Sequence, residues 1–142
     1  MKYIIFGLGV CVCIVIGAVV YGVSGQEGNE STNKVSSGTI SKEQFVSEWS
    51  AAKSTGARLI DVRTPGEYEA GHYDGAEMID FYADDFTEQI NALDKDSVYF
   101  IYCQSGNRSG QALRKMQALK FTKVYDLAGG IGGNGNILPI VR

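Results

Sequence analysis

Five consecutive apolar residues, "VYFIY" at 98–102, are followed directly by the small, polar, glycine-containing segment "CQSGNRSG". An uninterrupted apolar run of this length suits a β-strand that is covered on both faces, as in a parallel sheet. Beyond the polar segment, apolar residues recur at helical spacing at Ala112, Leu113, Met116 and Leu119. The region therefore predicts a strand, a tight loop and a helix in succession.

Similar alternation continues along the chain. Ser41 and Gln44 form a capping-box pattern at the start of a helical stretch that reaches Gly56. A second helical stripe is expected around 86–93, and a short helical turn over 67–70. Strands are predicted at 58–62, near 77–79, at 98–102 and at 123–127. Strands separated by helices predict an α/β fold in which helices cover both faces of a central parallel sheet.

The N-terminal segment has a different character. Residues 3–23 contain no charge, and 21 residues are enough to span a bilayer. We predict that residues 1–25 form a transmembrane anchor or a cleaved signal peptide, and that the polar residues 26–38 form a flexible linker. Residues 39–142 then form the folded domain. Lys2 is the only basic residue before the span, which favours export of the domain. It would be anchored in the cytoplasmic membrane, facing the periplasm or exterior, or secreted to the periplasm.

Charge and cysteine content limit the partners. Twelve of the 13 Lys and Arg residues and all 16 acidic residues follow residue 25, which gives 12 − 16 = −4 and argues against a nucleic-acid partner. Cys11 and Cys13 lie in the apolar segment, so Cys103 is the only cysteine of the predicted domain. An internal disulfide and a cysteine zinc site are thereby excluded there. We expect no metal or organic cofactor, and a monomer.

Cys103 lies at the predicted junction between strand and helix, which is where α/β sheets bind ligands. Converging amides of a tight loop and the positive end of a helix dipole would stabilise a thiolate and lower the pKa of Cys103. The alternative is a buried cysteine that does no chemistry. The only histidine, His72, lies in the turn-like "AGHYDGA", where a structural role is favoured.

Three segments, "LIDVRTPGEYEAGHYDGA", "YCQSGNRS" and "VYDLAGGI", resemble the motifs of the single-domain rhodanese-like sulfurtransferase family, in the same order. The resemblance covers residues 39–141. It implies a three-layer α/β fold and a thiosulfate:cyanide type of sulfurtransferase with an unknown natural substrate. It also implies that Cys103 takes a sulfane sulfur from a small-molecule or protein donor, holds it as a persulfide and passes it to a thiophilic acceptor.

The same resemblance assigns roles to individual residues. Asp61 and Arg63 match the family's "DVR" and are expected to brace the site, with Arg63 paired to Glu67. Ser109 is expected to open the following helix. The loop whose amides would cradle the persulfide consists of Gln104, Ser105, Gly106, Asn107 and Arg108.

Two departures from the family pattern affect these expectations. Gln104 is neutral where thiosulfate-using members often carry a basic residue, which argues against thiosulfate as the natural donor. Asn134 stands where an aromatic residue usually packs. We therefore expect a loose C-terminal segment. The active-site loop is not expected to depend on that segment directly.

Two other functions fit parts of the sequence. A cysteine-dependent phosphatase or arsenate reductase could use the same sheet, but those enzymes typically have five residues between cysteine and arginine, and here four separate Cys103 from Arg108. The shorter loop suits a single sulfur atom better than a tetrahedral oxyanion. A non-enzymatic rhodanese-like binding module is the other alternative.

Overall fold

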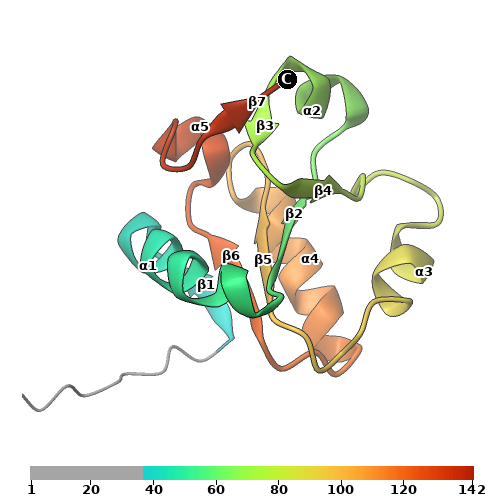
Figure 1. The fold of residues 1–142 in the computed structure, drawn as a ribbon. Coiled ribbons are helices and arrows are strands. Elements are labelled where there is room, and N and C mark those ends of the chain that lie inside the picture. The colour runs from blue at the N-terminus through green and yellow to red at the C-terminus, as the bar shows by residue number, and fades with distance from the viewer. Residues whose placement is uncertain (1–36) are drawn as a thin grey trace, which may run out of the picture. The chain divides into compact units, whose positions relative to one another are not determined.

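A parallel sheet of five strands, in the order β1-β6-β5-β2-β4, forms the centre of the domain (Figure 1). The computed structural model describes residues 37–142. The predicted anchor or signal and all but the last two residues of the predicted linker lie outside that range. The strands are β1 (Gly38–Ile40), β2 (Arg58–Asp61), β4 (Ala76–Met78), β5 (Tyr99–Tyr102) and β6 (Val124–Leu127). The predicted α/β class is confirmed.

Strand β5 occupies the middle of the sheet because every one of its residues is apolar enough to be buried. Its alternate residues contribute to two separate cores. Ile101 packs in the core on one face, whereas Phe100 and Tyr102 pack in the core on the other. The run of apolar residues is therefore explained by burial on both sides.

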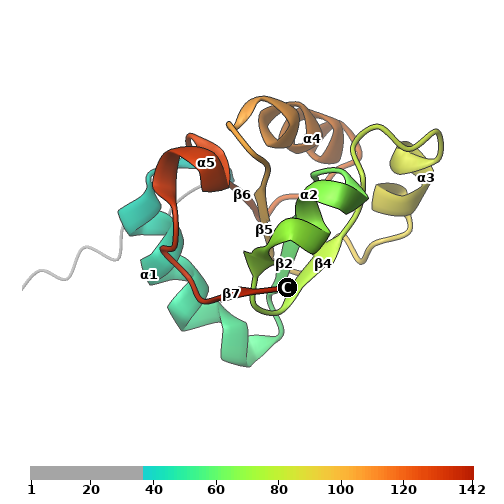
Figure 2. The ribbon, with the colours of Figure 1, turned by 90° about the horizontal axis from the view of Figure 1, so that it is seen from above.

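Helices complete the three layers (Figure 2). Helices α1 (Lys42–Ala52) and α5 (Gly130–Asn134) cover one face, where Phe45 and Ile131 contribute to the core. Helices α3 (Phe86–Asn91) and α4 (Asn107–Ala118) cover the other, with Phe86 and Met116 in its core. A short 3-10 helix, Lys53–Thr55, follows α1. The predicted capping box is present, since Ser41 Oγ accepts from the Gln44 amide and Gln44 Oε1 accepts from the Ser41 amide.

Several elements differ from the sequence predictions. Strand β1 precedes the first predicted helix and begins at Gly38, one residue before the predicted domain start. A separate two-stranded antiparallel sheet joins β3 (His72–Tyr73) to β7 (Ile140–Val141). Helix α4 begins at Asn107, so the expectation that Ser109 opens it was wrong by two residues. Strands β1, β3 and β7 have only two or three residues each, which is too short to leave a periodic signal in the sequence.

Within residues 37–142, no helix has the length and apolar character needed to cross a membrane. The same residues contain no cluster of three or more His, Cys, Asp or Glu side chains placed to hold a metal ion.

Candidate active site

Cys103 follows the last residue of β5 and has a fully buried side chain. Its Sγ accepts a hydrogen bond from the Gly106 amide at 3.1 Å and one from the Ser109 hydroxyl at 3.4 Å. Ser109 is itself fully buried, in the first turn of α4. The Gly106 amide points at the sulfur as the amide cradle requires, whereas the Ser109 hydroxyl is a donor that the sequence reasoning missed.

These contacts determine the acidity of the thiol. Burial alone would raise the pKa of Cys103, but hydrogen bonds from the Ser109 side chain and from the amides of Ser109, Ser105 and Gly106 outweigh it. The net result is a pKa below the ordinary value for cysteine. A thiol with a lowered pKa is a better supply of thiolate, which is the nucleophilic form.

The shape of the loop depends on Gly106, the residue before α4, which has a φ of +87°. L-residues with a side chain rarely adopt this left-handed conformation, whereas glycine does so at little cost. An added Cβ would also lie 3.1 Å from the backbone nitrogen of Gly129. Glycine is therefore required at position 106, both by the backbone turn and by the close approach of Gly129.

Helix α5 binds the main chain of the active-site loop directly. The Ile131 amide donates to the carbonyl of Cys103, and the Gly132 amide donates to the carbonyl of Gln104, both at 2.8 Å. A Cβ at Gly130 would overlap the Cys103 carbonyl oxygen, and one at Gly132 would lie 2.7 Å from the Gln104 carbonyl oxygen. The expectation that the loop does not depend on the C-terminal segment was therefore wrong.

Asn134 stabilises this helix in place of the expected aromatic residue. Its side-chain amide donates to the carbonyls of Ala128 and Gly130, at 2.7 and 2.8 Å. These bonds tie the end of α5 to the glycine turn at its start. The predicted looseness of the segment is thus opposed by a hydrogen-bonded cap and by the pairing of β7 with β3.

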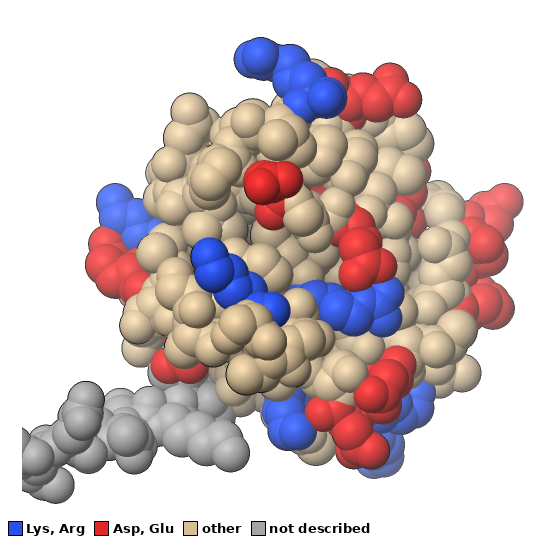
Figure 3. Space-filling view, viewed as in Figure 1, with Lys and Arg blue, Asp and Glu red and all other residues tan. Residues whose placement is uncertain are grey.

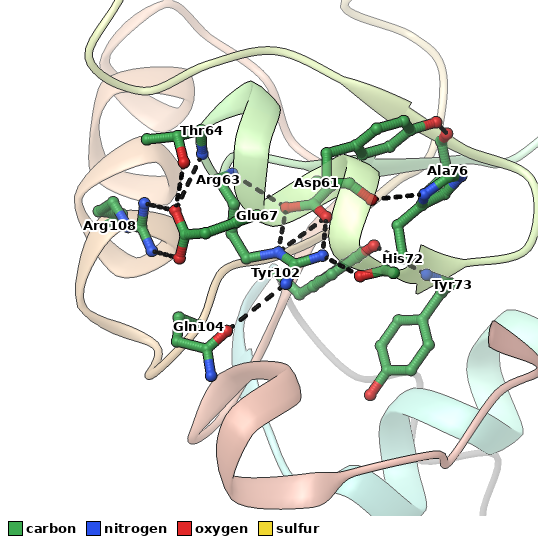
Figure 4. Close-up of polar contacts among 12 residues, drawn as sticks. Asp61, Arg63, Thr64, Glu67, His72, Tyr73, Ala76, Tyr102, Gln104 and Arg108 are labelled. Carbon is green, nitrogen blue, oxygen red and sulfur yellow. Dashed lines mark hydrogen bonds and ion pairs between the residues drawn. The ribbon is translucent and has the colours of Figure 1, made fainter. Parts of the chain in front are cut away.

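Asp61 and Arg63 form a buried ion pair beside the loop (Figure 4). The Arg63 Nε donates to both carboxylate oxygens of Asp61, and Nη2 donates to Asp61 Oδ2 at 2.7 Å and to the Gly71 carbonyl at 2.7 Å. The side chains are only 0 % and 5 % exposed. Nη1 faces Gln104 Oε1 at 3.5 Å, so this brace lies next to the loop.

The expected pairing of Arg63 with Glu67 was wrong, because Glu67 pairs with Arg108 instead (Figure 4). Two hydrogen bonds of 2.7 Å join the guanidinium to the carboxylate. Thr64 also donates to Glu67 through its amide and its hydroxyl, which caps α2 (Pro65–Ala70). The Arg108 bonds, helped by those from Thr64, lower the pKa of Glu67 to about 2.

Both arginines near the thiol are therefore neutralised by carboxylates. Arg108 also lies over the ring of Tyr82, which is 66 % exposed, at 5.6 Å. Basic and acidic side chains are interspersed on the face shown in Figure 3. The positive potential at the sulfur comes from the Ser109 hydroxyl together with the peptide amides, since Arg63 and Arg108 are each paired with a carboxylate.

His72 has the structural role that its context predicted. Its ring stacks on Tyr68 at a centroid distance of 3.5 Å, and Nδ1 lies 2.9 Å from the Tyr68 carbonyl oxygen. No hydrogen bond or ion pair described for residues 37–142 joins His72 to Cys103.

Comparisons with known proteins agree with this geometry. Residues 44–133 match the family model described as the rhodanese-like domain. The chain belongs to the rhodanese-like domain family. This match covers more than half of the chain and includes the loop, the Asp61–Arg63 pair and most of α5.

Individual relatives extend the comparison. The "Uncharacterized protein YqhL" of Bacillus subtilis is 35 % identical over 92 residues, which cover 65 % of this chain and 68 % of that protein. The protein named thiosulfate sulfurtransferase GlpE in Pseudomonas entomophila is 33 % identical over 91 residues, covering 64 % and 78 %. A rhodanese-related protein of Thermoplasma volcanium superposes with a TM-score of 0.58 at 24 % identity, covering 72 % and 96 %. The last likeness shows the fold alone.

Proposed function

We propose that this rhodanese-like domain is a sulfurtransferase in which Cys103 carries the sulfur as a persulfide. The observation that supports this most strongly is the hydrogen bonding of Sγ by the Gly106 amide and the Ser109 hydroxyl. These donors stabilise negative charge on sulfur, which is required twice in the reaction. The family assignment and the sulfurtransferase name of the Pseudomonas relative agree with the proposal.

The reaction proceeds in two displacement steps. The Cys103 thiolate first attacks the sulfane sulfur of the donor, so that an S–S bond forms to Sγ while the bond between the sulfane sulfur and the rest of the donor breaks. The donor remainder leaves with the electron pair. A thiophilic acceptor then attacks the outer sulfur of the persulfide, and the Cys103 thiolate leaves with the electron pair of the broken S–S bond.

Activity of the thiosulfate:cyanide type follows from the family as an expected assay activity. Thiosulfate is nevertheless a poor candidate for the natural donor. Gln104 brings no charge, and Arg63 and Arg108 are each bonded to a carboxylate. Since both arginines near the sulfur in residues 37–142 are paired, a dianion gains little electrostatic attraction to compensate for its lost hydration.

Phosphate chemistry is less consistent with the site. A phosphatase of this kind needs its arginine to bind the oxyanion, whereas both terminal nitrogens of Arg108 are occupied by Glu67. The donors around Cys103 also converge on one sulfur atom. Turnover of an aryl phosphate that disappears in Cys103→Ser would support the phosphatase alternative instead.

A non-enzymatic role is the remaining alternative. A docking module has no use for a cysteine with a lowered pKa, so the hydrogen bonds at Cys103 favour the enzyme. Full complementation of a deletion strain by Cys103→Ala would favour the binding module.

Intact-mass measurement tests the proposal. Incubation with a sulfane donor, followed by removal of excess donor, should add about 32 Da for one persulfide sulfur. Peptide mapping should place it at Cys103 rather than at Cys11 or Cys13, and Cys103→Ser should lack it. Absence of the adduct with thiosulfate, a polysulfide and a low-molecular-weight persulfide alike would contradict the proposal.

We also propose that the domain is exported, through residues 1–25 acting as an anchor or signal. The support is the uncharged run of 21 residues after Lys2. A reporter that is active only outside the cytoplasm, fused after residue 142, should be active with the full chain. It should be inactive when residues 2–25 are deleted.

A further inference from the structure

The buried carboxyl of Asp126 lies on the same face of the sheet as Cys103. Asp126 is in β6, where it is the cross-strand partner of Ile101, and Cys103 follows two residues after Ile101. Directly paired residues and residues two apart on a strand share a face of the sheet. The Asp126 side chain therefore lies in the layer between the sheet and the start of α4, where Ser109 is also buried.

This carboxyl is poorly solvated. Asp126 is 1 % exposed, and Oδ2 accepts a hydrogen bond of 2.9 Å from the Thr39 hydroxyl. Its other carboxylate oxygen, Oδ1, is buried and has no hydrogen-bond partner among residues 37–142. A buried carboxylate with an unpaired oxygen is costly, and the usual outcome is that the group takes up a proton.

The polar and charged groups that face Asp126 come from two elements, α4 and β1. Burial raises the pKa of Asp126, and nearness to Ser109 and Arg114 of α4 and to Thr39 of β1 lowers it without cancelling the increase. Around Cys103, the facing groups are the amides of the loop, the Ser109 hydroxyl and Arg108, whose charge is paired with Glu67.

Ser109 lies near both ionisable groups. Its hydroxyl donates to Cys103 Sγ at 3.4 Å, and it lies close to the Asp126 carboxyl without a bond of good geometry to Oδ1. A hydroxyl has a single hydrogen to donate. When that hydrogen stabilises a thiolate, it is withheld from the carboxylate, and the reverse also holds.

We propose that Cys103 and Asp126 hold one negative charge between them, with the Ser109 hydroxyl turned toward whichever group is charged. In the exchange, the thiol proton of Cys103 moves to the Asp126 carboxylate, so that a thiolate and a carboxylic acid replace a thiol and a carboxylate. The proton stays inside the protein and no other reactant is needed. Two buried like charges around one shared donor repel, so ionisation of both groups is delayed to higher pH.

The role in sulfur transfer rests on the proposed function. Each time the acceptor removes the outer sulfur, Cys103 leaves as a thiolate, and a neutral Asp126 makes that charge easier to accommodate. Asp126 is thus a positioning residue that acts on Cys103 through Ser109, without contact with the donor.

Titration of the full chain without any sulfur donor tests the pair. The alkylation rate of Cys103, followed by peptide mass spectrometry, reports thiolate against pH, and carbon NMR of labelled aspartate reports Asp126. In the wild type we expect the Cys103 rate to rise in two steps. In Asp126→Asn it should rise in one step, below the upper step of the wild type. In Cys103→Ala the upper transition of Asp126 should move to lower pH. The size of this shift should equal the shift of the upper Cys103 transition in Asp126→Asn, because coupling between two sites is reciprocal.

Two further variants sharpen the result. Thr39→Val removes the remaining hydrogen bond of the carboxyl and should increase the share of thiolate in the lower step. Asp74→Asn, at an exposed position, removes the same charge elsewhere and should change neither titration. An unchanged Cys103 profile in Asp126→Asn, or an unchanged Asp126 titration in Cys103→Ala, overturns the inference. If Asp126→Asn fails to fold, the Cys103→Ala measurement decides alone. Failure of persulfide formation would instead overturn the sulfurtransferase and leave these titrations intact.

Discussion

The guanidinium of Arg108 and the carboxylate of Glu67 meet through two hydrogen bonds of 2.7 Å. This pair links the first turn of α4 to α2, on either side of the site. It also engages both terminal nitrogens of Arg108.

The Glu67–Arg108 pair should make stability depend on acidity. The pKa of Glu67 falls from 4.5 to about 2 on folding, so the stabilisation is complete above pH 4.5 and is lost as the pH falls toward 2. A fully buried pair with this pKa shift would contribute about 3 kcal/mol to the free energy of unfolding. Because the Glu67 side chain is 31 % exposed and water screens the pair, we expect a contribution of about 1 kcal/mol. Urea unfolding of Glu67→Gln should show this deficit at pH 7 and none near pH 2. A deficit that persists at pH 2 would contradict it.

The same variant should alter donor selectivity. Glu67→Gln leaves the charge of Arg108 without its partner, and that charge lies near enough to Cys103 to interact with the thiolate. We expect the KM for thiosulfate to fall, with a smaller change for an uncharged sulfane donor such as an organic trisulfide. Steady-state assays with both donors measure the difference, and an equal change for both would show that Glu67 acts only on stability.

Glycines in α5 offer a steric test of the loop contact. Gly130→Ala places a Cβ against the Cys103 carbonyl at a φ of +59°, and we expect a loss of about 2 to 4 kcal/mol in unfolding free energy together with slower alkylation of Cys103. Gly133 belongs to the same helix and has open space at its Cβ. Gly133→Ala should be neutral or stabilising by about 0.5 kcal/mol. Equal losses of unfolding free energy in Gly130→Ala and Gly133→Ala would show that the contact between Gly130 and the Cys103 carbonyl is unimportant.

The Ser109 hydroxyl should account for much of the acidity of Cys103. Ser109→Ala removes the side-chain donor to Sγ and should raise the pKa of Cys103, because the amide donors that remain must offset the whole cost of burial. A hydrogen bond to a charged group contributes about 1.5–3 kcal/mol, so alkylation at neutral pH should slow by about tenfold. Ser50→Ala, at an exposed position of α1, serves as the control. An unchanged rate against pH in Ser109→Ala would exclude this role.

Burial, rather than bond length, should decide which ion pair matters for stability. Asp61→Asn leaves the Arg63 charge buried and poorly compensated, and we expect a cost of about 3 kcal/mol. The Arg58–Glu77 pair is shorter, at 2.6 Å, but its side chains are 34 % and 48 % exposed. Glu77→Gln should cost less than about 1 kcal/mol. Chemical denaturation of the two variants gives the comparison, and similar costs would contradict it.

Sequence periodicity was enough to predict the layers of this fold. The apolar residues of β5 and the stripe on α4 are long signals that burial enforces, so the start of each element was predicted to within one or two residues. Strands β1, β3 and β7 have two or three residues each. Their existence is set by partners elsewhere in the chain, which no local pattern reveals.

The candidate site was predicted unevenly for a similar reason. Cys103 and its loop are contiguous in sequence, so one glycine-containing segment indicated all of them. The partners of Arg63 and Arg108 depend on how α2 and α4 face each other, and sequence reasoning placed Glu67 with the wrong arginine. The burial of Asp126 near Ser109 could not be predicted, because a single aspartate in a strand is equally compatible with a solvent-exposed position. The repeated glycines of "GGIGG" were the available hint that backbone approaches backbone there.

Helix α5 contacts the active-site loop through main-chain hydrogen bonds, which do not depend on the identity of the side chains. Redesign of this site therefore has to keep Gly130 and Gly132, because a Cβ at either would collide with the carbonyls of Cys103 and Gln104. Side chains offer the freedom that this contact lacks, since Gln104 faces Arg63 Nη1 at 3.5 Å and the exposed ring of Tyr82 lies beside Arg108. A library at these two positions would vary the groups next to the two arginines while leaving the main-chain contact unchanged.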